Sequence, residues 1–405
     1  MQNTQSRTTI WRIGDEPGNR QFAGIGNLKT ERGAIIPDVQ VAYEMYGKLN
    51  AQKSNAILVL HGFTGDSHAA GRKGPGHIGD GWWNAIIGPG KALDTDRFCV
   101  VVPNVLGGCQ GTTGPGSLDS DAKPWGSRFP KITIRDMVET ERKLIDALDI
   151  EKLHGVVGVS LGGQRGVEWG VQHSERIGSL VIIGSNAVAS AEQIATQSIQ
   201  LELIRNDPSF HKGDYYNVGD GSGPQVGMAS ARRVGHMTYR TAEELERRFA
   251  NQTQGTDDPF SENAQFAVTS YLDHMASKLA ARFDPNTYIA INEAMCSHDV
   301  GRGHGRGVEG TLAALTQIDT HVVVVSIDQD RLYPPYQQKF LEKHIANARL
   351  RKMSAIQGHD AFLTNDADIA LILRETFPTI PMSMRQPDFT PVNSVFDAAT
   401  LALHA

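Results

Sequence analysis

The chain has 405 residues, 40% of them hydrophobic and 21% charged, with a formal net charge of −6. This length allows a large buried core, and an acidic chain without a long Lys/Arg run argues against nucleic acid or an anionic membrane as a partner. The three cysteines are too few for a disulfide framework, and no apolar stretch is long enough to span a membrane. Because the N-terminal residues show no secretory signal pattern, we expect a cytoplasmic protein.

The first half of the chain alternates short apolar runs with helical patterns. The first 30 residues predict an irregular arm, and residues 38–47 partly alternate, as an edge or half-exposed strand does. Buried strands are predicted by four apolar runs: 55–62, 98–104, 153–160 and 179–185. Helices are predicted over 133–149, where Thr133 and Asp136 resemble a capping box, and over 161–173.

In the second half of the chain, the alternation of apolar runs with helical patterns stops over residues 186–300 and then resumes. Residues 186–300 show helical patterns, and apolar residues at helical spacing predict core positions at Val268, Leu272, Met275, Leu279 and Phe283. Two further strands are predicted over 320–328 and 348–356, each followed by a helix. Alternating buried strands and helices predict an α/β protein with a parallel sheet covered on both faces. We expect a split sheet domain (1–185 and 301–379), a helical lid insertion (186–300) and a C-terminal tail (380–405).

Gly158-Val-Ser160-Leu-Gly162 follows an apolar strand and precedes a helix. A G-x-S-x-G sequence in that setting is typical of a serine nucleophile on a strained strand-to-helix turn, the arrangement of α/β-hydrolase enzymes. Glycines two residues before and after the serine avoid crowding in the turn. The alternative is a glycine-rich junction with an incidental serine; the strand and helix on either side favour the nucleophile.

A serine hydroxyl needs a base, and the base needs an orienting acid. In this fold the acid and then the histidine follow the serine along the chain. His359 lies in a glycine-flanked loop after the last predicted strand, and Asp328 and Asp330 both follow the strand before it. Spacing therefore predicts His359 as the base and leaves the two aspartates open as the acid.

An oxyanion hole requires two backbone donors. The N–H of Leu161, directly after the nucleophile, is the first. The second is expected in the loop after an earlier strand, at the N–H of Phe63 in the run LHGFTG.

Other motifs are weaker. Gly74–Gly79 matches G-x-G-x-x-G in letters only, since no strand precedes it, so we expect no dinucleotide site. The pairs His61/His68 and His298/His304 fit no standard ligand spacing, so we expect no metal.

Long collinear runs over roughly residues 20–378 resemble the homoserine O-acetyltransferase family, which has the α/β-hydrolase fold. These runs are LHGFTGDSHAAG (60–71), GVSLGGQRGVEW (158–169), SARRVGHMTYR (230–240), HDVGRG (298–303), DQDRLYP (328–334) and GHDAFLT (358–364). The resemblance implies that Asp330 rather than Asp328 is the acid. It also implies that Arg232 and Tyr239 bind the acceptor, with Asp360 holding its ammonium group.

The implied reaction is a ping-pong transfer of acetyl from acetyl-CoA, a co-substrate rather than a bound cofactor, to the hydroxyl of L-homoserine in methionine biosynthesis. A homodimer is also implied. The alternatives are a succinyl-CoA donor or serine acceptor in the same family, and a serine esterase with the same triad. The family usually has H-A-L-T-G where this chain has His61-Gly-Phe-Thr-Gly, and G-G-S-M-G-G where it has Val159 and Leu161.

Overall fold

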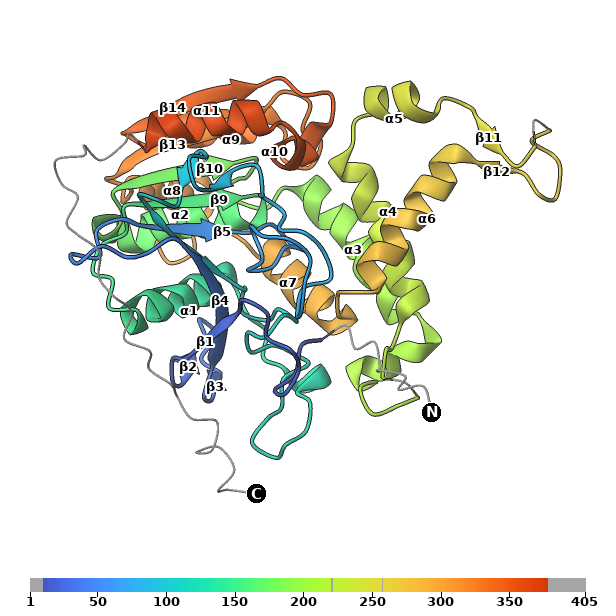
Figure 1. Ribbon diagram of the computed structural model, residues 1–405, viewed down its shortest axis with the longest axis horizontal. Helices are drawn as coiled ribbons and strands as arrows, with labels where there is room; N and C mark the ends of the chain where they lie inside the picture. Colours follow the sequence, from blue (N-terminus) through green and yellow to red (C-terminus); the bar gives the residue numbers. More distant parts are fainter. Residues whose placement is uncertain (1–9, 220, 257, 378–405) are drawn as a thin grey trace.

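The computed structural model describes residues 10–377 except 220 and 257, and an eight-stranded sheet forms its centre (Figure 1). Across the sheet the strands are β1 (Gln21–Gly24), β4 (Gln40–Tyr46), β8 (Cys99–Pro103), β5 (Ala56–Leu60), β9 (Gly155–Val159), β10 (Ser179–Ile183), β13 (His321–Ile327) and β14 (Ala348–Met353). The strands from β8 to β14 are parallel, and β4 runs antiparallel to both neighbours. The predicted parallel sheet is therefore confirmed.

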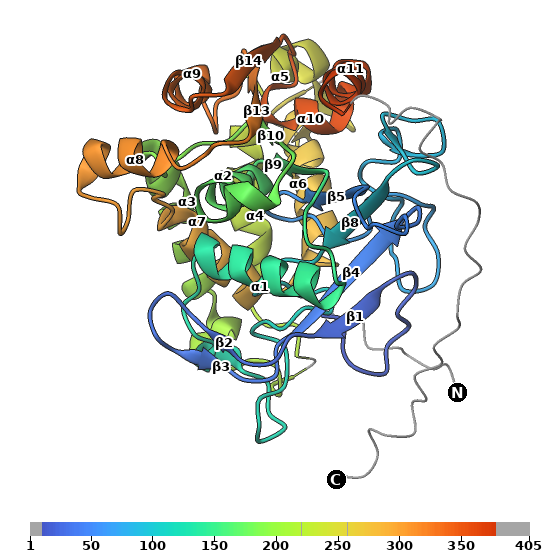
Figure 2. The same cartoon turned by 90° about the vertical axis from the view of Figure 1, so that its left-hand side faces the viewer.

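Helices cover both faces of the sheet, as the two views in Figures 1 and 2 show. They are α1 (Ile134–Ala147), α2 (Leu161–His173), α8 (Gly307–Leu315), α9 (Pro335–His344), α10 (Ala361–Thr364) and α11 (Asp366–Thr376). Side chains alternate along each central strand, so Leu180 and Ile182 of β10 pack in the cluster with α1 and α2, whereas Val181 and Ile183 pack in the cluster with α11. Burial on both faces explains why these strands are continuous apolar runs.

Between β10 and α8 the chain forms a mostly helical segment. Its helices are α3 (Ala191–Arg205), α4 (Gln225–Tyr239), α5 (Ala242–Phe249), α6 (Ala267–Ala280) and α7 (Pro285–Cys296). The segment leaves and rejoins the core at one place, where Val188 pairs with Asp299. Between α5 and α6, the strands β11 (Thr253–Gln254) and β12 (Gln265–Phe266) extend away from the body (Figure 1). The division into core, lid and tail remains a prediction, and residues 380–405 lie outside the described part.

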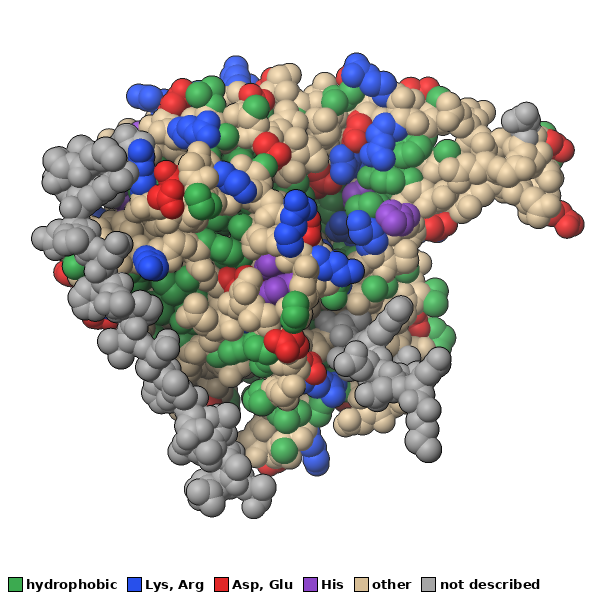
Figure 3. Space-filling model, in the orientation of Figure 1, with side chains coloured by type: hydrophobic (Ala, Val, Ile, Leu, Met, Phe, Trp, Pro, Cys, Tyr) green, Lys and Arg blue, Asp and Glu red, His purple; other side chains and the backbone are tan. Residues whose placement is uncertain are grey.

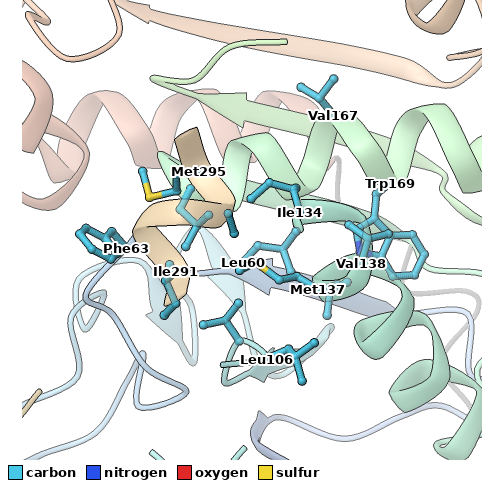
Figure 4. Close-up of a cluster of buried hydrophobic side chains, with 14 of the residues drawn as sticks. Leu60, Phe63, Leu106, Ile134, Met137, Val138, Val167, Trp169, Ile291 and Met295 are labelled. Carbon is cyan, nitrogen blue, oxygen red and sulfur yellow. The ribbon is translucent and has the colours of Figure 1, made fainter. Parts of the chain in front are cut away.

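Helix α7 is packed tightly against the sheet domain. Figure 4 shows Ile291 and Met295 of this helix beside Phe63, Leu60 and Leu106, within one cluster of buried side chains. Phe63 also packs on Tyr288, with ring centroids 4.5 Å apart. The loop after β5 carries the predicted oxyanion donor at Phe63. Apolar contacts with α7 therefore fix this loop.

Two predictions for the N-terminal third are wrong. Residues 38–47 do not form an edge strand, because β1 pairs outside β4, and Val41–Glu44 are buried. The first 30 residues are not wholly irregular, since they supply β1 and β2. The remaining short strands are β2 (Leu28–Lys29), β3 (Ile35–Ile36), β6 (Ile87–Gly88) and β7 (Leu93–Asp94). Among the described residues, no helix combines the length and apolar character needed to cross a membrane.

Candidate active site

Ser160 sits on a strained turn between β9 and α2. Its backbone has φ 56° and ψ −119°, a left-handed conformation that costs a non-glycine residue of order 1–3 kcal/mol. A Cβ at Gly158 would lie 2.1 Å from the carbonyl oxygen of Gly162, and a Cβ at Gly162 would lie 1.9 Å from that of Leu60. Both glycines are therefore required by contact with backbone, which is the geometry that the G-x-S-x-G pattern predicts.

Replacing Gly162 with alanine is expected to destabilise the protein by at least about 3 kcal/mol, because the new methyl group meets a backbone oxygen that cannot move aside. The matched control is Gly166→Ala, four residues further along α2. There the nearest atom is the Cδ1 of Leu180 at 3.4 Å, an ordinary contact. Urea unfolding of both variants checks this; equal midpoints would contradict the steric account.

The structure brings the three predicted triad residues together. The Nε2 of His359 lies 2.9 Å from the Oγ of Ser160, and its Nδ1 lies 2.7 Å from the Oδ2 of Asp330. All three side chains are buried. Asp328 is exposed, so the geometry selects Asp330 between the two aspartates that spacing left open. The catalytic roles of these residues remain predictions.

Asp330 is held on its second oxygen as well. Its Oδ1 accepts hydrogen bonds from the backbone N–H groups of Leu332 (2.9 Å) and Tyr333 (2.8 Å). The loop after β13 therefore fixes the carboxylate so that Oδ2 faces the imidazole. Because a carboxylate only accepts hydrogen bonds, Nδ1 of His359 carries the proton and Nε2 is free to accept one from Ser160.

Burial lowers the pKa of His359, but the facing Asp330 carboxylate outweighs it and leaves the pKa above the ordinary 6.5. A general base works only when neutral, so we expect the rate of Ser160 acylation to rise as pH increases through this raised pKa. Pre-steady-state acylation rates measured across pH check the expectation. An apparent pKa below 6.5 for this step would show that Asp330 does not stabilise the imidazolium.

The loop after β5 runs alongside Ser160, since a Cβ at Gly62 would lie 3.6 Å from the Cβ of Ser160. His61 donates from Nδ1 to the carbonyl of Gly62 (2.7 Å) and accepts the N–H of Val105 at Nε2 (3.2 Å). Burial, with Arg165 nearby, lowers the pKa of His61 to about 3, so its ring stays neutral. These contacts fix the peptide between Gly62 and Phe63.

A buried ion pair beneath this loop was not predicted from the sequence. Arg165 of α2 pairs with Glu141 of α1 and also donates to the carbonyl of His61, while Trp169 donates to Glu141 (2.8 Å). These side chains are almost fully buried. Since charged residues on helices usually face solvent, nothing in the sequence marked this pair. It ties the helix that follows Ser160 to the loop that carries Phe63.

The three residues expected to bind the acceptor lie close to the triad. The Arg232 guanidinium stands 5.1 Å from the ring centroid of Tyr239, whose ring is 5.8 Å from that of His359. Arg232 is 9% exposed, and its Nε and Nη1 have no hydrogen-bond partner within the described residues. Asp360 forms an ion pair with Arg240 at 3.1 Å, and burial raises the pKa of Asp360 above its ordinary value.

Two cavities lie in this region, a small one at Ser160 and a larger one lined in part by Arg232. A small pocket at Ser160, of about 10 Å³, is lined by Phe63, Thr196, Gln197, Gln200, Thr238, Tyr239, Met295 and Leu332. A larger cavity of about 980 Å³ lies between the segment 64–82 and the helices α4 and α6, with basic side chains at Arg12, Arg20, Lys73, Arg232, Lys278 and Arg282. Figure 3 shows basic and acidic side chains bordering a hollow between the sheet domain and the helical segment.

The α6 region that borders this cavity was predicted to be a core face. Of the five apolar residues at helical spacing, Leu279 and Phe283 are buried, whereas Val268, Leu272 and Met275 are half-buried. Met275 and Leu279 line the large cavity. The prediction is therefore wrong for three positions, and one of these, Met275, borders the large cavity.

Glu44, His68 and His77 bring three groups of metal-ligating type within 4.8 Å of one another. The two imidazole rings are stacked, with centroids 3.8 Å apart and an angle of 11° between their planes. Because imidazole lone pairs lie in the ring plane, two nearly parallel rings cannot both direct them at one ion. Glu44 already accepts from Tyr46 (2.9 Å) and Ser67 (3.0 Å), so the cluster acts as an anchor for the loop after β5.

A serine at the apex of a strand-to-helix turn, in line with a histidine and an aspartate from later loops, is the arrangement of an α/β-hydrolase-fold enzyme. The family model described as "alpha/beta hydrolase fold" matches residues 55–366. In solved structures, esterase E22 aligns with a TM-score of 0.78 and 26% identity, covering 88% of this chain and 99% of its own. Homoserine O-acetyltransferase from Bacillus anthracis aligns with a TM-score of 0.79 and 25% identity, covering 89% and 97%.

Sequence relatives narrow this class. Homoserine O-acetyltransferase of Thermobifida fusca (strain YX) is 48% identical over 370 residues, covering 91% of this chain and 96% of that protein. The Clavibacter michiganensis enzyme of the same name is 46% identical, covering 91% and 95%. The chain belongs to the homoserine O-acetyltransferase family, and it is an acyltransferase with the α/β-hydrolase fold.

Proposed function

We propose that this enzyme transfers an acetyl group from acetyl-CoA to the side-chain hydroxyl of L-homoserine through an acetyl-Ser160 intermediate, a step of methionine biosynthesis. The observation that carries the proposal is the buried pair of contacts from His359 to Ser160 and to Asp330, next to an arginine with unpaired donors. The relatives at 44–48% identity support the choice of acceptor and acyl group.

In the first step, His359 takes the proton of Ser160 as its oxygen attacks the thioester carbonyl, and CoA leaves as a thiol after receiving that proton. In the second step, homoserine's hydroxyl gives its proton to His359 and attacks the acetyl ester, which returns Ser160 to its free form. Each step passes through an oxyanion, and losing one donor to such a group costs about 2.7–4 kcal/mol of barrier.

The N–H groups of Leu161 and Phe63 are the proposed oxyanion donors. Leu161 begins α2, where an N–H has no partner within the helix. In a trans peptide the carbonyl and the N–H point in opposite directions, and the Gly62 carbonyl points to Nδ1 of His61. The N–H of Phe63 is therefore turned away from His61, on a loop that runs alongside Ser160.

Arg232 is the proposed partner of the homoserine carboxylate, because a buried guanidinium with two unpaired nitrogens suits paired hydrogen bonds to a carboxylate. The Tyr239 ring beneath it fixes its position. Asp360 is the proposed partner of the homoserine ammonium, which would share that carboxylate with Arg240.

Arg232→Leu is expected to lower kcat/KM for homoserine by about 100-fold, while acetylation of Ser160 by acetyl-CoA changes by less than about threefold. The neighbouring Arg233→Leu is the matched control, since Arg233 is about half exposed and pairs with Asp273 at the surface. Steady-state kinetics with homoserine and stopped-flow acylation separate the two steps. Equal losses in both steps would assign Arg232 to the donor or to folding instead.

Acetyl-CoA is the proposed co-substrate, bound only during turnover, because the relatives at 46–48% identity are named homoserine O-acetyltransferases.

A serine esterase is the second candidate, because esterase E22 shares the fold to the same extent as the Bacillus anthracis acetyltransferase. Product analysis with acetyl-CoA, with and without homoserine, distinguishes them. The transferase proposal expects O-acetylhomoserine and slow release of free acetate. Free acetate at an unchanged rate, with no acetyl ester formed, would establish the esterase.

Two further points belong to the same proposal. The reaction uses side chains and backbone of this chain, with no role assigned to a metal or a permanently bound cofactor. We also propose a homodimer and a cytoplasmic location, as expected for a biosynthetic enzyme of this family.

A further inference from the structure

Tyr333 is buried beside the triad, and no role was predicted for it from the sequence. Its ring centroid lies 5.3 Å from that of His359, and its backbone N–H is bound by Asp330. The Nε2 of Gln193 donates to the same hydroxyl (3.3 Å). A buried phenol that accepts from an amide, beside the imidazole that contacts Ser160, therefore needs an explanation beyond packing.

Gln193 is itself the end of a row of buried amides. The Nε2 of Gln164 donates to Asn186 (3.0 Å), and the Nδ2 of Asn186 donates to Gln193 (3.2 Å). These side chains are almost fully buried and come from α2, the loop after β10 and the first turn of α3. The row thus connects the helix behind the nucleophile, through the lid, to the phenol.

The directions of the hydrogen bonds around Ser160 and in the amide row can be worked out starting from Asp330. A carboxylate only accepts, so His359 carries its proton on Nδ1 and must accept at Nε2. Ser160 then donates to His359, which leaves the Ser160 oxygen free to accept a further hydrogen bond. The phenol oxygen in turn accepts from Gln193, so all the amides donate in one direction. Hydrogen bonds aligned in this way strengthen one another.

We propose that Tyr333 is a positioning residue whose hydroxyl, oriented by Gln193, donates to the Ser160 oxygen and so turns the serine proton toward His359. No bond to Tyr333 forms or breaks, and its proton stays on the phenol throughout. The same donor faces the negative charge that develops on the serine oxygen during attack. Burial, together with the neighbouring Asp330, raises the pKa of Tyr333, which keeps the phenol protonated.

The inference rests on the proposed nucleophilic role of Ser160 and not on the identity of donor or acceptor. The test therefore uses the acylation burst with p-nitrophenyl acetate, an activated ester that needs neither CoA nor homoserine. A burst in the wild-type protein without any homoserine acetylation would reject the proposed function and leave this inference standing.

Tyr333→Phe keeps the ring and is expected to lower the burst rate constant about ten- to hundredfold, with little change in the ester concentration giving half-saturation. Tyr336→Phe is the matched control, because Tyr336 is 63% exposed and should behave as wild type. Unfolding midpoints report any loss of stability. A wild-type burst in Tyr333→Phe, whatever its midpoint, would overturn the proposal.

Gln193 variants test the orientation itself. Gln193→Leu should lower the burst as Tyr333→Phe does, and the double variant should be no slower than the slower single variant. Gln193→Glu should be impaired when the new carboxylate accepts the phenol proton, and its rate relative to wild type should recover as pH falls and that group protonates. Two results would contradict the proposed orientation of Tyr333 by Gln193. One is that the losses in burst rate add in the double variant; the other is that the burst rate of Gln193→Glu relative to wild type does not change with pH.

Discussion

Ser160→Ala is expected to lower kcat for acetyl transfer by about 10⁶-fold, the scale on which loss of a serine nucleophile acts elsewhere. The methyl group leaves the fold intact, since the strained backbone with φ 56° is set by the turn and its glycines rather than by the hydroxyl. The same variant should gain no acetyl group on mixing with acetyl-CoA. Steady-state kinetics and intact-protein mass spectrometry check both statements.

Ser198→Ala supplies the matched control, because Ser198 lies exposed on α3 with its hydroxyl bound to the carbonyl of Ala195. It should turn over at the wild-type rate. If Ser160→Ala kept more than about a hundredth of wild-type turnover, direct transfer between the two substrates would replace the acyl-enzyme mechanism.

Asp330→Asn is expected to lower kcat by about 10⁴-fold with little effect on the backbone. Two backbone N–H groups, of Leu332 and Tyr333, require an oxygen at the Oδ1 position, so the new amide nitrogen must face His359. A donor at that place turns Nδ1 into an acceptor and moves the imidazole proton to Nε2. The ring then presents a proton to Ser160 and can no longer accept one.

The ¹⁵N chemical shifts of His359 report this tautomer directly, since protonated and unprotonated ring nitrogens differ widely. We expect Nδ1–H in the wild-type protein at high pH and Nε2–H in Asp330→Asn. Asp328→Asn is the control, because Asp328 is exposed and should change neither kcat nor the tautomer. Full activity in Asp330→Asn would mean that another group orients His359.

The sheet and the triad could be predicted because their signals are local. Each central strand is a continuous apolar run, and the turn at Ser160 carries its own steric requirement at Gly158 and Gly162. The order of the strand ends then limited the base to His359. Spacing left Asp328 and Asp330 open, and the choice between them depends on which oxygen faces the ring, a property of the folded loop.

Polar residues that become buried were missed, and they account for the main errors. Glu44 contributes to the partial alternation of apolar and polar residues over 38–47, which predicted an edge or half-exposed strand. Its carboxylate is instead buried among Tyr46, Ser67 and His68. Arg165 and Gln193 lie on helices, where charged and amide side chains usually face solvent. Their partners come from segments far along the chain, so neither periodicity nor spacing could show the pairing.

The central claim is that the acyl group is carried by one serine, and brief mixing with acetyl-CoA followed by digestion and peptide mass spectrometry tests it most directly. The account predicts one added acetyl group on the peptide containing Ser160, which disappears when homoserine is added as O-acetylhomoserine forms. A protein that turns over while this peptide stays unmodified, or that carries the acetyl group on a different residue, would contradict the account.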